Sequence, residues 1–211
     1  MAKKIFLTPS NQPENKYAYG NTNEHDQCGK IAEACRVALT RCGFEVKVAQ
    51  DVSLTEKCSL SNSWGADLHI PIHTNAYNGK VTGTRMFYYN KNGEGYKACN
   101  AIYNVLAPFT PGTSENCSQN QTLVEMAKPK APSVYIEVDF HDVPEIAKWI
   151  INNTTQIGEK IAEGVCKYYG VSYVANKTTV DTSKYEAEIK TLKAKVSELE
   201  GKIAKVKEIV K

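Results

Sequence analysis

Short apolar runs alternate along this chain with longer segments in which apolar residues recur at helical spacing. The runs lie at 4–8, 44–49, 66–73, 84–89 and 132–138, and the helical segments lie at 24–42, 54–64, 94–106 and 146–169, the last one interrupted near 152–155. Strands that alternate with helices of this length are typical of a parallel sheet covered on both faces. The sequence therefore predicts an α/β fold with a mostly parallel central sheet of about six strands.

Two stretches between these elements lack periodicity. The first follows residue 8 and is rich in Asn, Pro, Gly and Tyr, and the second begins at Pro108 and is rich in Asn, Ser and Gln. Long loops without structure of their own usually serve function. We expect the first to be functional and the second to line a substrate groove.

The pattern changes after residue 170. Residues 171–183 have no periodicity and are expected to form a linker. From 184 to 211 a seven-residue a/d repeat runs through Ile189, Leu192, Val196, Leu199, Ile203, Val206 and Val210. β-Branched a positions with leucine at d favour two parallel strands. We expect a globular domain over 1–170 and a C-terminal coiled-coil helix over 184–211 that forms a homodimer or another oligomer. The alternative is one amphipathic helix packed on the domain.

Composition excludes several classes of protein. The chain has 42% hydrophobic and 23% charged residues, which is ordinary globular usage. Its net charge of +3 is small and partly due to tail lysines, so no nucleic-acid partner is expected. Seven cysteines without a CxxC pair indicate reduced, buried thiols. No export signal and no membrane-spanning run is found, so we expect a cytoplasmic protein.

Two polar residues stand at the ends of apolar runs. His73 ends the run at 66–73 and Glu137 follows Tyr135 and Ile136. Active sites of open α/β sheets form where strands end. An apolar surrounding would raise the pKa of Glu137 and suit it to general acid/base catalysis. The structural alternatives are a satisfied core histidine and a glutamate in a salt bridge at the sheet edge. His69 lies deeper in the same run and is expected in the core.

These residues resemble the zinc-dependent N-acetylmuramoyl-L-alanine amidases of type 3. The family's Ile-His-x-Asn-Ala strand end matches 72–76, its Pro-x-Val-x-x-Glu strand matches 132–137, and its helix-start glutamate matches Glu24. The resemblance covers about residues 4–170 and implies a peptidoglycan hydrolase that cleaves the amide bond between N-acetylmuramic acid and L-alanine. It implies Zn²⁺ bound by Glu24 and His73, with Glu137 as the general acid/base.

The chain departs from the family at the first zinc ligand. The family's Gly-His-Gly turn after the first strand reads Pro9-Ser10-Asn11-Gln12 here. The candidates for the missing ligand are His141, His25, Asn11 and Gln12. Amides are poor zinc ligands, and His25 joins Glu24 at one ion only if the helix start unwinds. We favour His141, because it follows the strand that carries Glu137.

The resemblance and the missing export signal together favour a phage or prophage endolysin that waits in the cytoplasm until it reaches bacterial peptidoglycan. Two alternatives are a metallopeptidase of related fold and a catalytically inactive cell-wall-binding module, in which the coiled coil would add avidity.

Overall fold

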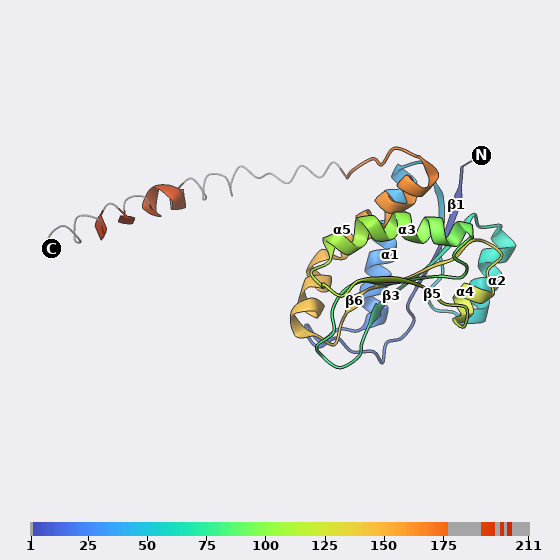
Figure 1. Cartoon of the computed structure of the whole chain (residues 1–211), viewed down its shortest axis with the longest axis horizontal. Helices are drawn as coiled ribbons and strands as arrows, with labels where there is room; N and C mark the ends of the chain where they lie inside the picture. Colours follow the sequence, from blue (N-terminus) through green and yellow to red (C-terminus); the bar gives the residue numbers. More distant parts are fainter. Residues whose placement is uncertain (1, 177–190, 197–198, 201, 204–211) are drawn as a thin grey trace. The chain divides into compact units, whose positions relative to one another are not determined.

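The fold is built on one six-stranded sheet in the order β2-β1-β3-β6-β4-β5 (Figure 1). The computed structural model describes residues 2–176, 191–196, 199–200 and 202–203. The strands are β1 (Lys4–Pro9), β2 (Glu45–Val48), β3 (Leu68–Asn75), β4 (Arg85–Tyr88), β5 (Asn116–Gln119) and β6 (Val134–Phe140). Neighbouring strands are parallel except β4 and β6, which are antiparallel. The predicted α/β class and mostly parallel sheet are confirmed.

Helices connect the strands and cover the sheet. They are α1 (Glu24–Arg41), α2 (Leu54–Trp64), α3 (Glu94–Leu106), the short 3-10 helix η1 (Ala107–Phe109), α4 (Val124–Ala127) and α5 (Pro144–Tyr169). The expected interruption of the last helix is a kink, because Asn153 has non-helical backbone angles inside α5. The Asn153 side-chain amide donates to the carbonyl of Trp149 one turn earlier.

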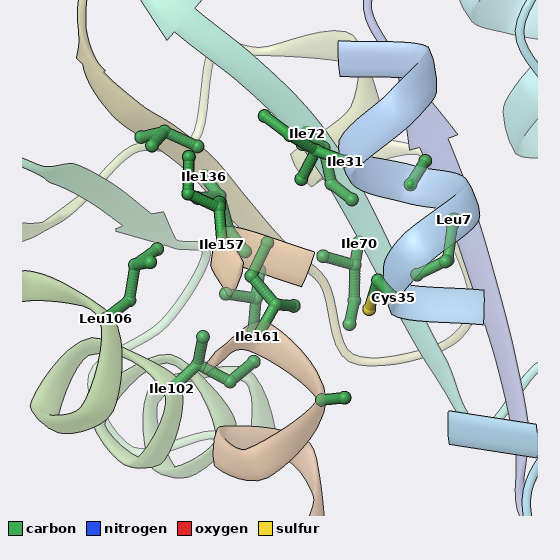
Figure 2. Close-up of a cluster of buried hydrophobic side chains, with 14 of the residues drawn as sticks. Leu7, Ile31, Cys35, Ile70, Ile72, Ile102, Leu106, Ile136, Ile157 and Ile161 are labelled. Carbon is green, nitrogen blue, oxygen red and sulfur yellow. The ribbon is translucent and has the colours of Figure 1, made fainter. Parts of the chain in front are cut away.

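One face of the sheet supplies the apolar core. Ile70 and Ile72 of β3 point to this face together with Ile136 of β6, and all three are fully buried. Figure 2 shows them against isoleucines of α1, α3 and α5. Side chains of a strand alternate between the two faces, so this packing turns the histidines of β3 to the other face. The apolar core thereby fixes the direction in which His69 and His73 point.

The opposite face is polar beneath α2 and α4. His69 is fully buried, as expected, and its Nε2 lies 3.3 Å from Oε1 of Glu125 in α4. Lys57 of α2 is also fully buried, and its ammonium group donates to the carbonyl of Pro9 at 2.7 Å. This bond holds the end of β1, from which the loop 10–23 departs.

The second irregular stretch was expected to have no structure of its own, but it contains the edge strand β5, and the single helical turn α4 follows that strand. The predicted coiled coil at 184–211 falls mostly outside the described residues and stays a prediction. The residues of the tail that the structure describes are helical. Four apolar residues among them are each more than half exposed: Leu192, Val196, Leu199 and Ile203. The part of the chain that the structure describes contains no helix long and apolar enough to cross a membrane.

Candidate active site

The site begins at the N-terminus of α1. Asn23 caps this helix, since its side chain accepts from the backbone N–H of Asp26 at 2.9 Å. Glu24 is therefore the first helical residue, and it is only 1% exposed. The backbone N–H of Glu24 donates to the carbonyl of Asn15 at 2.9 Å. The cap and this bond fix the direction of the Glu24 carboxylate.

Glu24 and His73 face each other across the end of β3. His73 Nδ1 lies 2.8 Å from Glu24 Oε1, which also accepts from the backbone N–H of Thr74 at 3.2 Å. The second oxygen of Glu24 accepts from the Asn15 side chain at 2.7 Å. These bonds oppose the effect of burial and hold the pKa of Glu24 below its usual value. The structure thus brings together two of the residues predicted as metal ligands.

Glu137 lies on β6 beside this pair. His73 and Glu137 are partners in the parallel register of β3 and β6. Oε2 of Glu137 is enclosed and has no hydrogen-bond partner among the described residues. Burial raises the pKa of Glu137 well above its usual value, and the negative charge of Glu24 raises it further. The ion pairs of the described residues do not include Glu137, and its enclosed Oε2 agrees with the expected desolvation.

His141 reaches the same end of the sheet from the residue after β6. Its Nδ1 lies 3.1 Å from the carbonyl of Thr74 and 2.9 Å from the Thr74 hydroxyl. Because a carbonyl only accepts, this contact assigns the ring proton to Nδ1 and leaves a lone pair on Nε2. Burial lowers the pKa of His141, which favours the neutral ring. Tyr17 stacks on the ring with centroids 4.9 Å apart.

A pocket of about 250 Å³ joins these residues. Its lining combines carboxylate, imidazole and amide groups: Gln12, Asn15, Glu24, His73, Thr74, Asn75, Ala76, Tyr135, Glu137 and His141. A second pocket of about 380 Å³ lies between Tyr89 and Ser133. It lies at the other end of the strands, where β6 begins and the antiparallel β4 ends. Only the smaller pocket holds the predicted site residues.

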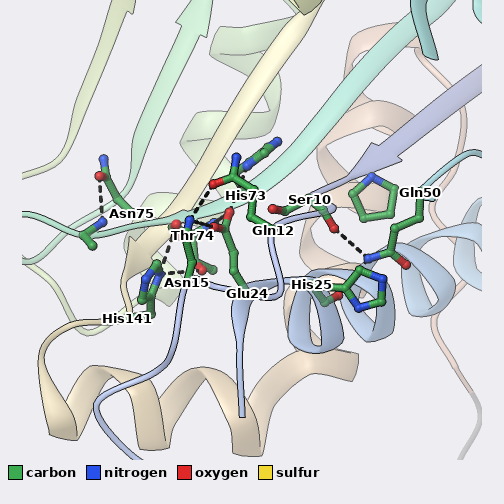
Figure 3. Close-up of polar contacts among 12 residues, drawn as sticks. Ser10, Gln12, Asn15, Glu24, His25, Gln50, His73, Thr74, Asn75 and His141 are labelled. Atoms are coloured by element: carbon green, nitrogen blue, oxygen red, sulfur yellow. Dashed lines mark hydrogen bonds and ion pairs between the residues drawn. The ribbon is translucent and has the colours of Figure 1, made fainter. Parts of the chain in front are cut away.

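The structure divides the four candidates for the missing ligand into two that line the smaller pocket and two that do not. His141 and Gln12 line the smaller pocket. His25 instead contacts Asp26 and Asp51, at 3.0 and 2.8 Å, and lies beside Gln50 (Figure 3). The Asn11 side chain donates to the carbonyl of Val52 at 3.0 Å. His25 and Asn11 are therefore directed away from the site, while His141 and Gln12 stay available.

Sequence reasoning missed two residues of the first loop that shape the site. The Asn15 amide donates to both Glu24 and Gln12, the latter at 2.5 Å. The Tyr17 hydroxyl lies 2.9 Å from the Thr74 hydroxyl, so this tyrosine contacts both Thr74 and His141. Asparagine and tyrosine are common in that loop, and no periodicity distinguishes these two. The only available signal was the unusual length of the loop itself.

The residues at the pocket fit a zinc ion in part. Glu24 and His73 provide the carboxylate and imidazole that zinc prefers, and Glu24 Oε1 lies 2.8 Å from His73 Nδ1, where an ion bound by both would take the place of the shared proton. However, no three His, Cys, Asp or Glu side chains are grouped closely enough to hold a metal ion within residues 2–176 and the described parts of the tail. The structure thus brings together two of the three residues predicted as metal ligands, while the Nδ1 atom of His141 is hydrogen-bonded to Thr74.

The fold and this polar pocket at the ends of β3 and β6 define a hydrolase-like α/β domain. The family model of N-acetylmuramoyl-L-alanine amidases matches residues 5–167, so the chain belongs to that family. No curated protein sequence matches the chain significantly.

Solved structures agree with this fold. The catalytic domain of the amidase CwlV from Bacillus (Paenibacillus) polymyxa var. colistinus superposes with a TM-score of 0.71 at 16% identity, over 81% of this chain and 99% of that one. An N-acetylmuramoyl-L-alanine amidase from Clostridium difficile 630 gives 0.71 at 22% identity, over 80% and 97%. The catalytic domain of the CD27L endolysin, which targets Clostridia difficile, gives 0.63 at 24%, over 77% and 96%. At these identities the likeness extends to the fold alone.

Proposed function

We propose that this protein is a peptidoglycan hydrolase that cleaves the amide bond between N-acetylmuramic acid and the L-alanine of the stem peptide. One observation carries the proposal: in a member of the amidase family, Glu137 lies in one pocket with the Glu24–His73 pair. Amide hydrolysis needs a group that moves a proton from the attacking water to the leaving nitrogen. Glu137 is suited to that role because Oε2 of its carboxyl group is enclosed and has no hydrogen-bond partner among the described residues.

Each residue of the pocket has a separate part in the proposed reaction. Glu137 carries the proton between water and the leaving nitrogen. Glu24 and His73 form the ion-binding side of the pocket, and Asn15 keeps the Glu24 carboxylate oriented through its 2.7 Å hydrogen bond. Tyr17 holds the ring of His141 by stacking. Water exclusion around Glu137 strengthens its interactions with the substrate.

We further propose that the site uses Zn²⁺, with Glu24, His73 and His141 as ligands. Histidines that bind metals usually donate their second ring N–H to a carbonyl or carboxylate. The contact from His141 Nδ1 to the Thr74 carbonyl is of this kind and supports Nε2 as the binding atom. When bound, the ion would activate water, polarise the substrate carbonyl and favour the ionised form of Glu137.

Analysis of the products tests the reaction. Purified peptidoglycan would be incubated with the zinc-loaded protein and, as a control, with protein treated with a chelator. We expect new free amino termini on L-alanine and glycan strands that keep the lactyl group. New amino termini at other residues would identify a metallopeptidase instead. Wall binding without any released product would identify an inactive binding module.

The biological role that we propose is that of a phage or prophage endolysin, cytoplasmic until its release to the cell wall and dimeric through the C-terminal helix. The heptad pattern supports the dimer. Expression in a bacterial cytoplasm tests this role: growth continues until the membrane is permeabilised, and rapid lysis then follows. Lysis without permeabilisation would contradict it.

A further inference from the structure

Two thiols meet at the edge of the sheet, away from the proposed active site. Cys99 lies on α3 and is fully buried, while Cys117 lies on β5 and is partly exposed. Their sulfur atoms are 2.9 Å apart. A disulfide bond measures about 2.05 Å, so a small side-chain rotation would bring the two atoms to bonding distance. All seven cysteines are free in the structure.

The two thiols differ in the way that thiol–disulfide exchange requires. Cys117 is partly accessible from solvent, and its hydrogen bond with Cys99 lowers its pKa. Cys99 is enclosed, and this hydrogen bond together with burial raises its pKa. The attacking group in exchange is an accessible thiolate. Cys117 is therefore suited to react first, and Cys99 to complete the exchange.

We propose that Cys99 and Cys117 form a disulfide by exchange with a low-molecular-weight disulfide such as oxidised glutathione, and that this bond fastens β5 to α3. The Cys117 thiolate attacks one sulfur of the small disulfide, forms a mixed disulfide and releases one small thiol. The Cys99 sulfur then attacks Cys117 Sγ and releases the second small thiol. The two protein thiols are oxidised, the small disulfide is reduced to two thiols, and the two protons pass to them.

The position of the pair explains what the bond would do. β5 is the edge strand of the sheet, and β4 is its only strand partner there. Edge strands are held on one side alone and are the more easily detached. A covalent link between residues 18 positions apart in sequence restricts the unfolded chain and so favours the folded one. A protein that acts on the cell wall leaves the reducing cytoplasm, so such disulfides become available to it there.

The test uses the full-length protein, reduced and then incubated with oxidised glutathione at pH 8. Free thiols are alkylated, and the digested protein is examined by mass spectrometry. We expect two fewer alkylated thiols and one cross-linked peptide pair, Cys99 with Cys117. The melting temperature should rise by about 5–10 °C relative to the reduced protein. Cys58→Ser is the matched control, because Cys58 is buried away from other thiols, and it should behave as the wild type.

Two variants separate the steps. Cys99→Ser should stop at a stable glutathione adduct on Cys117, and Cys117→Ser should form neither adduct nor cross-link. Seven free thiols after oxidation would overturn the proposal. A link between Cys42 and Cys166, which also contact each other, would overturn it as well. A Cys99–Cys117 link without a rise in melting temperature would contradict the proposal that the bond fastens β5 to α3. None of these outcomes depends on amidase activity.

Discussion

Replacing Glu137 with glutamine removes the carboxylate that carries the proton in the proposed reaction while keeping the size of the side chain. General acid/base groups contribute about 10²–10⁴-fold to rates, so Glu137→Gln should slow peptidoglycan hydrolysis by that factor. In activation free energy this is about 3–5 kcal/mol. Muropeptide release would be measured with purified peptidoglycan at saturating zinc, and the zinc content of both proteins would be compared. We expect equal zinc content, because Glu137 is not among the proposed ligands.

The same variant should change how stability depends on pH. Burial raises the pKa of Glu137 in the folded protein above its value in the unfolded chain. Below the unfolded value both states hold the proton. Above the unfolded value the unfolded chain loses this proton first. The free energy of unfolding therefore falls by up to about 1.4 kcal/mol per pH unit until the pKa of the folded state is reached. Glutamine does not titrate, and Glu137→Gln should lack this loss.

Urea unfolding of the metal-free proteins at pH 5 and pH 8 measures the difference. The stability of Glu137→Gln relative to the wild type should increase from pH 5 to pH 8. Other buried groups such as Asp139 titrate in both proteins and cancel in this comparison. A pH-independent difference would refute the enclosed, protonated state of Glu137. Wild-type hydrolysis rates in the variant would refute its catalytic role.

Three further predictions concern the ligands, the core and the tail. His141→Ala should lose bound zinc while His25→Ala keeps it, as measured by metal analysis after dialysis; unchanged zinc in His141→Ala would remove this histidine from the ligand set. Gly158→Ala should lower the free energy of unfolding by about 1–3 kcal/mol, because the added Cβ would lie 2.7 Å from Cβ of Ala34 on α1, and an unchanged urea midpoint would contradict this. Deletion of 176–211 should convert a dimer into a folded monomer in analytical ultracentrifugation, and a monomeric full-length chain would contradict the coiled coil.

The parts of the fold that the sequence predicts are those with a local signal. Helical periodicity predicted both ends of α1 to within one residue. The structure explains these ends, since Asn23 caps the helix and Gly43 follows it. β5 carries no such signal: its four residues include one apolar side chain, Cys117. Its strand conformation comes from pairing with β4, which is a contact distant in sequence. Tertiary pairing of this kind is invisible to a local pattern.

The candidate site likewise has one part that a local sequence pattern predicts and one part that it does not. The apolar runs predicted that His73 and Glu137 lie on neighbouring strands, which pair in parallel at these two residues. Both strands continue further than expected, β3 to Asn75 and β6 to Phe140. The contribution of the loop 10–23 depends on how that loop folds back. Its turn is closed by long-range bonds, such as the one from the Ala18 N–H to the His141 carbonyl at 2.9 Å. Only the folded chain reveals that Asn15 contacts Glu24.

The reversed direction of β4 has a consequence for the search for inhibitors. Because β4 runs against β6, the 380 Å³ hollow near Tyr89 and Ser133 lies toward the opposite end of β6 from the proposed active site. A compound bound in this hollow would leave Glu137 untouched, because Glu137 is not among the residues that line it. A useful competitor of the substrate must be small and polar enough for the 250 Å³ pocket. The volume of a cavity alone therefore does not identify the proposed active site of this protein.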